Sequence, residues 1–454
     1  TNTFNTAVGY FAGQQVTTGQ YNTILGGDAG DALTTGNSNV AIGYFALSTE
    51  DAHGLNVAVG SRALGNQNAG TDAYNVAVGA DAGLSVTTGV QNVLLGGLAG
   101  DALTDADANV ALGYAALSSD TLGSKSIAVG TGALFTQNFT TATNAYNVAV
   151  GDSAGNAVTT GVQNILIGGL AGDAITTGNS NVSVGHGSLS LNTASHRNTA
   201  IGEFALSALN ITTSTNAYNT ALGYSAGAGV TTGTQNTLIG GLTGDALTTG
   251  ALNVAVGYGA LTSDDLGSKS VALGHSTLAN QNYATATDSF NTAIGHSAGS
   301  AVTTGVQNTL IGAEAGDAMT DAILNVAVGY QALSGETSGR KSIGIGYGAL
   351  LAQNITTNSD VLNVAIGHFA GGSVTTGTLN VLIGGLAGDA LTDADENVAV
   401  GYKALSADTL GLKSTALGNE ALATQNFTTA TSSYNTAAGY RAGFAVTTGI
   451  RNTL

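Results

Sequence analysis

The sequence contains no proline, no cysteine and no tryptophan in 454 residues, and only 8% of its residues are charged. Without proline, nothing in the chain interrupts a backbone hydrogen-bond ladder. Without cysteine, disulfides and thiolate metal sites are excluded. No signal peptide is visible, and no apolar run approaches the roughly 20 residues of a membrane-spanning helix. These absences favour uninterrupted β-structure and predict no membrane insertion by this segment.

Basic residues are also scarce. Lys and Arg number 10 against 28 Asp and Glu, which gives a formal net charge of −18. Nucleic acid demands a basic face, and anionic membranes attract polybasic segments. The charge balance therefore predicts that neither is a partner.

Glycine is abundant, at 68 residues, and it follows a repeat. The pentapeptide Asn-x-Ala-x-Gly, with an aliphatic fourth residue, recurs along the whole chain, as at 75–79. Most steps between its glycines are 17 residues, and every fourth step is 19 or 21, so that a 72-residue superrepeat is superposed from Gly79 onward. Such periodicity is typical of a solenoid, which grows by stacking.

No linker or composition shift interrupts the repeat, which predicts one continuous domain over 1–454. Both ends of the sequence fall within a repeat, so we expect a piece of a longer repetitive chain. The superrepeats cover 5–74, 75–146, 147–218, 219–290, 291–362 and 363–434, with a partial one at 435–454.

The repeat predicts strands rather than helices. In 75–79, Val76 and Val78 project to one face and Ala77 to the other, which is the period of a strand. Seventeen residues accommodate two or three short strands with their turns. We therefore expect an all-β chain that forms a parallel β-solenoid of about 25 coils, stacked at about 4.8 Å to give a rod roughly 120 Å long.

The anchor residues have physical reasons in such a coil. Glycine after the strand allows a positive φ or close packing. Asparagine suits a turn, and stacked asparagines can form an amide ladder. The structural positions predicted on these grounds are Asn5, Asn22, Asn39, Asn56, Asn75, Asn92, Asn109, Asn147, Asn164, Asn181, Gly79, Gly151, Gly223, Gly295 and Gly367. Serine replaces asparagine in several fourth coils, which indicates a different preceding turn there.

The pattern Asn-x-Ala-x-Gly-x-x-Ala, repeated with Thr-Thr-Gly turns, resembles the head repeats of trimeric autotransporter adhesins (YadA-like β-rolls) and related phage tail-fibre repeats. The resemblance covers nearly the whole chain. It implies left-handed parallel β-rolls associated as trimers. It also implies that the small Ala77 and Gly79 face a sister chain.

Thr-Thr-Gly turns recur in two coils of four, as at 87–89 and 159–161. Regular threonine grids order water on ice-binding faces, but the neighbouring glycine favours simple turn chemistry. The Gly-Asp-Ala aspartates have a similar alternative. Asp101 with Asp105 and Asp107 could form an all-oxygen calcium site, although a turn role is favoured. The sequence predicts no metal site and no cofactor.

Third coils end in a cation, preceded in four cases by an acid, which predicts a surface ion pair across the turn or a charged stripe that recruits a neighbouring fibre. Fourth coils carry glycosylation sequons at Asn138, Asn210, Asn354 and Asn426. We expect the aromatic residues that end these coils, such as Tyr146, to wedge the longer loop over the core.

Catalytic motifs are missing, and the histidines (His53, His186, His196, His275, His296 and His368) keep no common register with an acid or serine. We therefore predict no enzyme. The sequence favours a structural fibre shaft or adhesin stalk, extracellular, at a cell surface or on a virion, that self-associates as a homotrimer or an end-to-end filament. The alternative is a surface-binding module for ice or cell-surface glycan, which would use the Thr turns or the fourth-coil loops.

Overall fold

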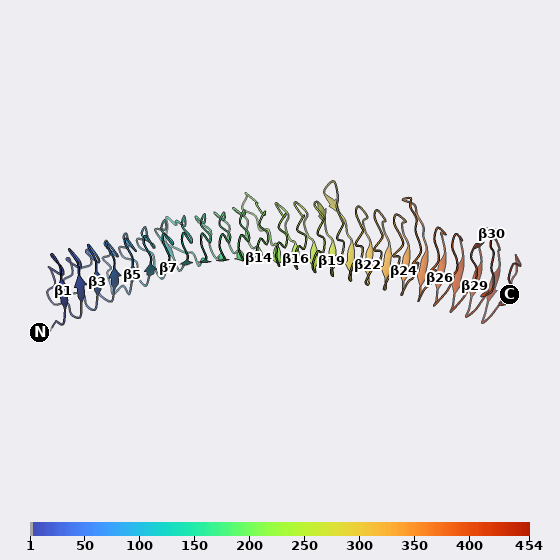
Figure 1. Cartoon of the computed structure of the whole chain (residues 1–454), viewed down its shortest axis with the longest axis horizontal. Helices are drawn as coiled ribbons and strands as arrows, with labels where there is room; N and C mark the ends of the chain where they lie inside the picture. Colours follow the sequence, from blue (N-terminus) through green and yellow to red (C-terminus); the bar gives the residue numbers. More distant parts are fainter. Residues whose placement is uncertain (1–2) are drawn as a thin grey trace. The chain divides into compact units, whose positions relative to one another are not determined.

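A computed structural model describes residues 3–454, and residues 1–2 of the predicted domain lie outside the described part. The predicted fold class is confirmed: the described chain is an all-β parallel solenoid whose anchor strands follow one another about 17 residues apart. It divides into two compact units, one ending at Ser225 and one running from Ala226 to Leu454. Within each unit, successive coils stack in sequence order (Figure 1).

The first unit contains thirteen three-residue strands and two of two residues in its described part. They are β1 (Thr6–Val8), β2 (Thr23–Leu25), β3 (Val40–Ile42), β4 (Val57–Val59), β5 (Val76–Val78), β6 (Val93–Leu95), β7 (Val110–Leu112), β8 (Gly123–Ser124), β9 (Ile127–Val129), β10 (Thr143–Asn144), β11 (Val148–Val150), β12 (Ile165–Ile167), β13 (Val182–Val184), β14 (Thr199–Ile201) and β15 (Thr220–Leu222).

The second unit repeats the design with twelve three-residue strands and four of two residues. They are β16 (Thr237–Ile239), β17 (Val254–Val256), β18 (Gly267–Ser268), β19 (Val271–Leu273), β20 (Thr287–Asp288), β21 (Thr292–Ile294), β22 (Thr309–Ile311), β23 (Val326–Val328), β24 (Ile343–Ile345), β25 (Val364–Ile366), β26 (Val381–Ile383), β27 (Val398–Val400), β28 (Gly411–Leu412), β29 (Thr415–Leu417), β30 (Thr431–Ser432) and β31 (Thr436–Ala438).

Neighbouring anchor strands pair in parallel and in register. Ala77 of β5, for example, lies opposite Leu94 of β6. Most coils contain one strand, where the sequence analysis expected two or three. The rest of the coil is turn, yet its backbone also bonds along the stack, as from the N–H of Thr87 to the carbonyl of Thr104. Glycines and other residues with positive φ keep these segments out of the strand conformation. The hydrogen bonds along the stack therefore continue in segments that are not strands.

The core is thin and lies inside each coil. The central residue of each strand points inward: Ala77 and Leu94 are fully buried, as are Ala82 and Val86 of the following turns. The expectation that Ala77 faces a sister chain is therefore wrong. Alanine takes this inward position in most coils and Ile or Leu takes it in the second coil of each superrepeat, whereas Val76 and Val78 are not buried.

Left-handed backbone is far commoner than the sequence indicated. Besides the anchor glycines, non-glycine residues adopt positive φ just before the anchor and in the turn after the strand, as at Gln91 (φ 62°) and Asp81 (φ 59°). Such residues cost of order 1–3 kcal/mol each and persist only where their surroundings over-determine them. The axial hydrogen bonds on both sides of every coil supply that constraint.

Candidate functional site

The anchor asparagines form a buried amide ladder along the stack. The Nδ2 of Asn164 donates to the carbonyl of Gly178 at 2.9 Å, and its Oδ1 accepts the backbone N–H of Asn181 at 3.0 Å. The second unit repeats the arrangement, with Asn380 bonded to Ala394 and Asn397. Each amide thus joins two coils and satisfies backbone groups that water cannot reach, which is how a buried polar group avoids its desolvation cost.

The hydrogen bonds at the anchor position differ in the fourth coils with serine, where residues of the longer loop take part in them. Ser126 takes the anchor position, and Gln137 from the loop donates to its Oγ at 3.0 Å. The Oε1 of Gln137 then accepts from Asn147 of the next coil at 2.8 Å. The loop that follows the serine therefore takes part in the anchor contacts, and it is also bonded to the preceding turn, because Gln137 donates to Asp120. In the shorter first loop, Asn56 keeps the asparagine, and its buried Nδ2 has no hydrogen-bond partner among the described residues.

The anchor glycines form a second ladder, with φ of 130–143°. A Cβ on Gly79 would lie 2.4 Å from the carbonyl oxygen of Gly96, and one on Gly295 would lie 2.5 Å from that of Gly312. Gly151 and Gly367 face equally close backbone of the next coil, and Gly223 shares their positive φ. Both the conformation and the approach of the next coil exclude any side chain at these positions.

An aliphatic stripe runs along the outward face of each unit. It consists of the last strand residue of every coil, and no described member is buried. In the first unit the members are Val8, Leu25, Ile42, Val59, Val78, Leu95, Leu112, Val129, Val150, Ile167, Val184, Ile201 and Leu222. In the second they are Ile239, Val256, Leu273, Ile294, Ile311, Val328, Ile345, Ile366, Ile383, Val400, Leu417 and Ala438. Leu95 is 37% and Leu222 47% exposed.

The threonine turns are bonded along the stack. Thr87 and Thr104 each donate their hydroxyl to the carbonyl of the residue one coil further on. Thr121 ends this column by donating to Oδ1 of Asn138 at 3.1 Å. Asn210, Asn354 and Asn426 accept the same bond from Thr193, Thr337 and Thr409, and all four sequon asparagines are exposed. The first threonine of each such pair is thereby occupied by the backbone.

The aromatic residues that end the fourth coils are not wedges, contrary to expectation. Tyr146 is 50% exposed and lies beside Lys125, whose Nζ is 5.3 Å from its ring centroid. The long loop is instead closed by the middle residue of the sequon, since Phe139 is only 6% exposed. Ile211, Tyr283, Ile355 and Phe427 take the same position. The regular apolar residue within the sequon was the signal for this role.

Three of the acids that precede a third-coil cation, Asp120, Glu336 and Asp408, are fully buried, and the fourth, Asp265, is half-buried. Among the described residues none of them pairs with that cation, so the expected ion pair across the turn is wrong. Asp120 accepts the backbone N–H of Gly123 at 3.0 Å and Nε2 of Gln137 at 2.5 Å. Lys341 instead pairs with Asp360, at 2.7 Å. In the second unit, burial raises the pKa of Asp264 to about 6, because desolvation penalises its charged form.

The Gly-Asp-Ala aspartates do not gather into a calcium site. Asp105 accepts the hydroxyl of Thr88 at 2.6 Å, and Asp107 accepts the N–H of Val90 at 2.8 Å, so each serves its own turn. Burial raises the pKa of Asp101, and the nearby Asp81 charge adds to the shift. Its Oδ1 is buried and makes no hydrogen bond to a described residue, as is also found for Asp31, Asp173, Asp317 and Asp389.

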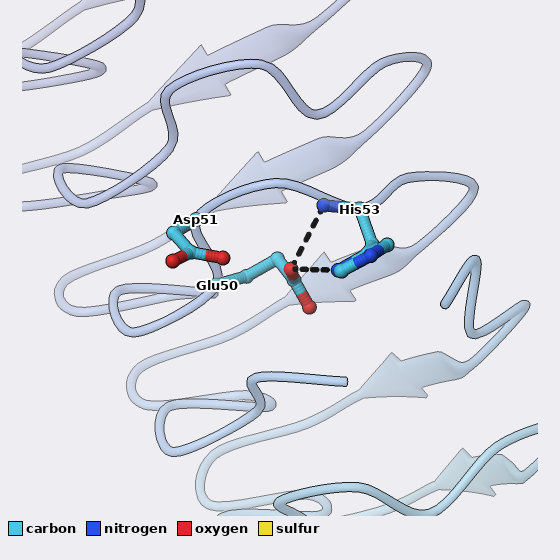
Figure 2. A group of neighbouring side chains, drawn as sticks. All are labelled: Glu50, Asp51 and His53. Atoms are coloured by element: carbon cyan, nitrogen blue, oxygen red, sulfur yellow. Dashed lines mark hydrogen bonds and ion pairs between the residues drawn. The ribbon is translucent and has the colours of Figure 1, made fainter. Parts of the chain in front are cut away.

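One group of side chains has the composition of a metal site. Glu50, Asp51 and His53 offer ligand atoms that all lie within 4.8 Å of one another, and no other such group of three occurs among residues 3–454. Figure 2 shows that they come from a single turn, with the carboxylates and the imidazole gathered on it. Sequence reasoning missed this group because it compared the histidines with one another. The sequence does contain an indication of this site, because His53 occupies a turn position that is Gly or Ser in the later superrepeats.

A shallow cleft of about 270 Å³ lies beside this turn, lined by Tyr44, Phe45, Ser48, Arg62, Gly65, Asn66 and Leu84. The rings of Tyr44 and Phe45 meet edge to face, with centroids 4.4 Å apart. Arg62 at its rim is held by Asp81 through contacts of 2.7 Å. The cleft therefore combines aromatic surface with a fixed cation.

No protein-family model and no curated protein matches the sequence. The described residues include no helix with the length and apolar character needed to cross a membrane.

Proposed function

We propose that the chain is a structural fibre shaft or adhesin stalk that sets a distance between an anchor and a tip at a cell surface or on a virion. The observation that carries the proposal is the unbroken axial bonding of the coils within each unit. Backbone and glycine contacts repeat from coil to coil, with asparagine or, in several fourth coils, serine at the anchor, so each coil stabilises its neighbours. No reaction is assigned to it.

Self-association of identical chains is the second part of the proposal. A row of thirteen outward aliphatic residues runs along the first unit, and a contiguous apolar row of this kind is typical of an interaction surface. A second copy of this chain has the same spacing along its stack, so two stripes can match side chain for side chain. The stripe positions carry no charge that would oppose the contact. The homotrimer that the adhesin resemblance implies would use this uniformity.

Cysteine cross-linking tests the association, because the native chain has no cysteine. Leu95→Cys places a thiol in the stripe, and Thr88→Cys places a matched thiol on an exposed turn away from it. Mild oxidation of dilute protein should link Leu95→Cys chains into covalent dimers and leave Thr88→Cys chains monomeric. Equal linking of both variants, or of neither, would contradict association through the stripe.

The cleft at Tyr44 and Phe45 favours a second candidate function, which is glycan binding. Aromatic rings beside an ordered polar rim suit the mixed apolar and polar faces of a sugar ring. Saturation-transfer NMR with a panel of monosaccharides should show contacts that Tyr44→Ala removes and Tyr114→Ala, at the same position of a later coil, retains. Identical spectra for the two variants would exclude the cleft.

A further inference from the structure

The turn formed by Glu50, Asp51 and His53 is the feature of the molecule that the shaft function leaves unexplained. We propose that it binds a borderline divalent cation of the zinc type. Imidazole nitrogen with carboxylate oxygens is a ligand set that Zn²⁺ accepts. His53 and Asp51 are partly or fully exposed and give access from solvent, while Glu50 is fully buried behind them.

The distance between His53 and Glu50 fits a shared ion better than a direct bond. The Nδ1 of His53 lies 3.6 Å from Oε1 of Glu50, and this nitrogen is buried without a hydrogen-bond partner among the described residues. A separation of 3.6 Å is too long for a hydrogen bond. Two ligand atoms bound to one tetrahedral Zn²⁺ at about 2.0–2.2 Å lie roughly 3.3–3.6 Å apart. The unpaired nitrogen and the carboxylate are therefore spaced as two ligands of one ion.

One oxygen of the buried Glu50 has only long hydrogen bonds, whereas Oε1 accepts the backbone N–H of His53 at 3.0 Å. The Oε2 of Glu50 accepts from Gln67 at 3.4 Å and from the backbone of Ala69 at 3.3 Å. The equivalent Glu336 accepts from Gln353 at 2.6 Å, and the equivalent aspartates 120, 264 and 408 accept from their glutamines at 2.5–2.7 Å. A buried charge with long bonds needs compensation. This turn alone among the six third coils has a histidine three residues after the acid.

The side chains of the site can be removed without loss of the coil. His53 contributes to the stack through its backbone, since its carbonyl accepts Nδ2 of Asn39 and its N–H donates to Glu50. Glycine makes both contacts at the matching position 123. Asp51 likewise bonds to Thr34 through its carbonyl. His53→Gly and Asp51→Asn should therefore fold as the native chain does.

Calorimetric titration of the full chain with Zn²⁺ tests the proposal, with excess Mg²⁺ present to saturate surface acids. A second titration uses Co²⁺ in place of Zn²⁺, because its absorption spectrum reports the coordination geometry. The native chain should bind about one ion in a tetrahedral environment. Loss of even an outer-shell partner costs roughly 10- to 100-fold in metal affinity, so His53→Gly should weaken binding at least that much, and Asp51→Asn should also weaken it.

The matched control is His275→Tyr. His275 stacks on His296 in the second unit, with ring centroids 5.3 Å apart. Tyrosine at the equivalent position 347 stacks on His368 in the same way, so this variant keeps the stack and removes one imidazole. It should bind Zn²⁺ as the native chain does. No saturable binding by the native chain, or loss in His275→Tyr with retention in His53→Gly, would overturn the proposal. The first outcome would leave His53 as a simple ionic partner of Glu50, without affecting the shaft function.

Discussion

The substitution Gly96→Ala tests the glycine ladder, with Gly97→Ala as its neighbour control. Gly96 has a φ of +135°, and an added Cβ would lie 2.4 Å from the carbonyl oxygen of Gly113. At Gly97 the Cβ would lie 3.6 Å from the ring of Tyr114 and 3.8 Å from the carbonyl oxygen of Ala80, which are ordinary contact distances. Alanine already occupies that position at Ala80 and Ala313. The two adjacent glycines therefore differ in what they tolerate.

The expected magnitude follows from two terms. An unfavourable backbone conformation costs about 1–3 kcal/mol. Separating this coil from the next one also weakens the bond from the N–H of Gly113 to the carbonyl of Leu95, now 2.8 Å, which contributes about 1 kcal/mol. Gly96→Ala should thus lower the free energy of unfolding by about 2–4 kcal/mol. Gly97→Ala should change it by less than about 1 kcal/mol, and in the stabilising direction.

Native-state hydrogen exchange measures the loss of stability around Gly96 amide by amide. A local measurement is needed because each coil of a solenoid contacts only its neighbours, so a substitution destabilises the coils next to it most. Protection should fall at the amides of Gly96 and Gly113 in Gly96→Ala and stay native in Gly97→Ala. Guanidinium unfolding gives the global value. Equal effects of the two substitutions, in either assay, would refute the account of the ladder.

Three further perturbations address the buried groups. Asn164→Asp should destabilise the first unit by several kcal/mol at pH 7, because it buries a charge, and less at pH 4; equal loss at both would contradict the amide ladder. Phe139→Ala should lower the free energy of unfolding by about 3 kcal/mol, and Tyr146→Ala, at an exposed residue, by less than about 1 kcal/mol. Thermal unfolding measures both, and a larger effect of Tyr146→Ala would indicate that Tyr146 closes the long loop over the core. The pKa of Asp264 rises from 3.8 to about 6 on folding, so this group lowers stability by about 3 kcal/mol as pH rises from about 3 to 7. Asp264→Asn should remove that part of the slope in guanidinium midpoints, and an unchanged slope would exclude Asp264 as its source.

The sequence predicted the fold because its period is exact at the anchors. Asparagine and glycine recur at the positions where coils contact one another, so their spacing directly reports the stack. The direction of the strand faces was harder to predict. Val76 and Val78 are more apolar than Ala77, so hydrophobicity alone points to the wrong face, yet Ala77 is the residue that is fully buried.

The turns and the candidate metal site could not be read from the repeat. Residues such as Gln91 adopt left-handed backbone because axial bonds impose it, and no local propensity indicates this. The group at Glu50 depends on how one turn departs from its equivalents. Asp120 and Lys125 are close in sequence, and the sequence therefore predicted an ion pair between them. Asp120 is buried and Lys125 is exposed, so the two side chains do not pair.

The mass of the particle in solution tests most directly the claim that identical chains associate through the aliphatic stripe. Sedimentation of the chain, whose monomer mass is 44.3 kDa, should give a particle of two or more chains. The double substitution Leu95→Lys with Leu112→Lys, which places charges in the stripe, should reduce the mass toward that of one chain. A native chain that sediments as a monomer at micromolar concentration would contradict association through the stripe.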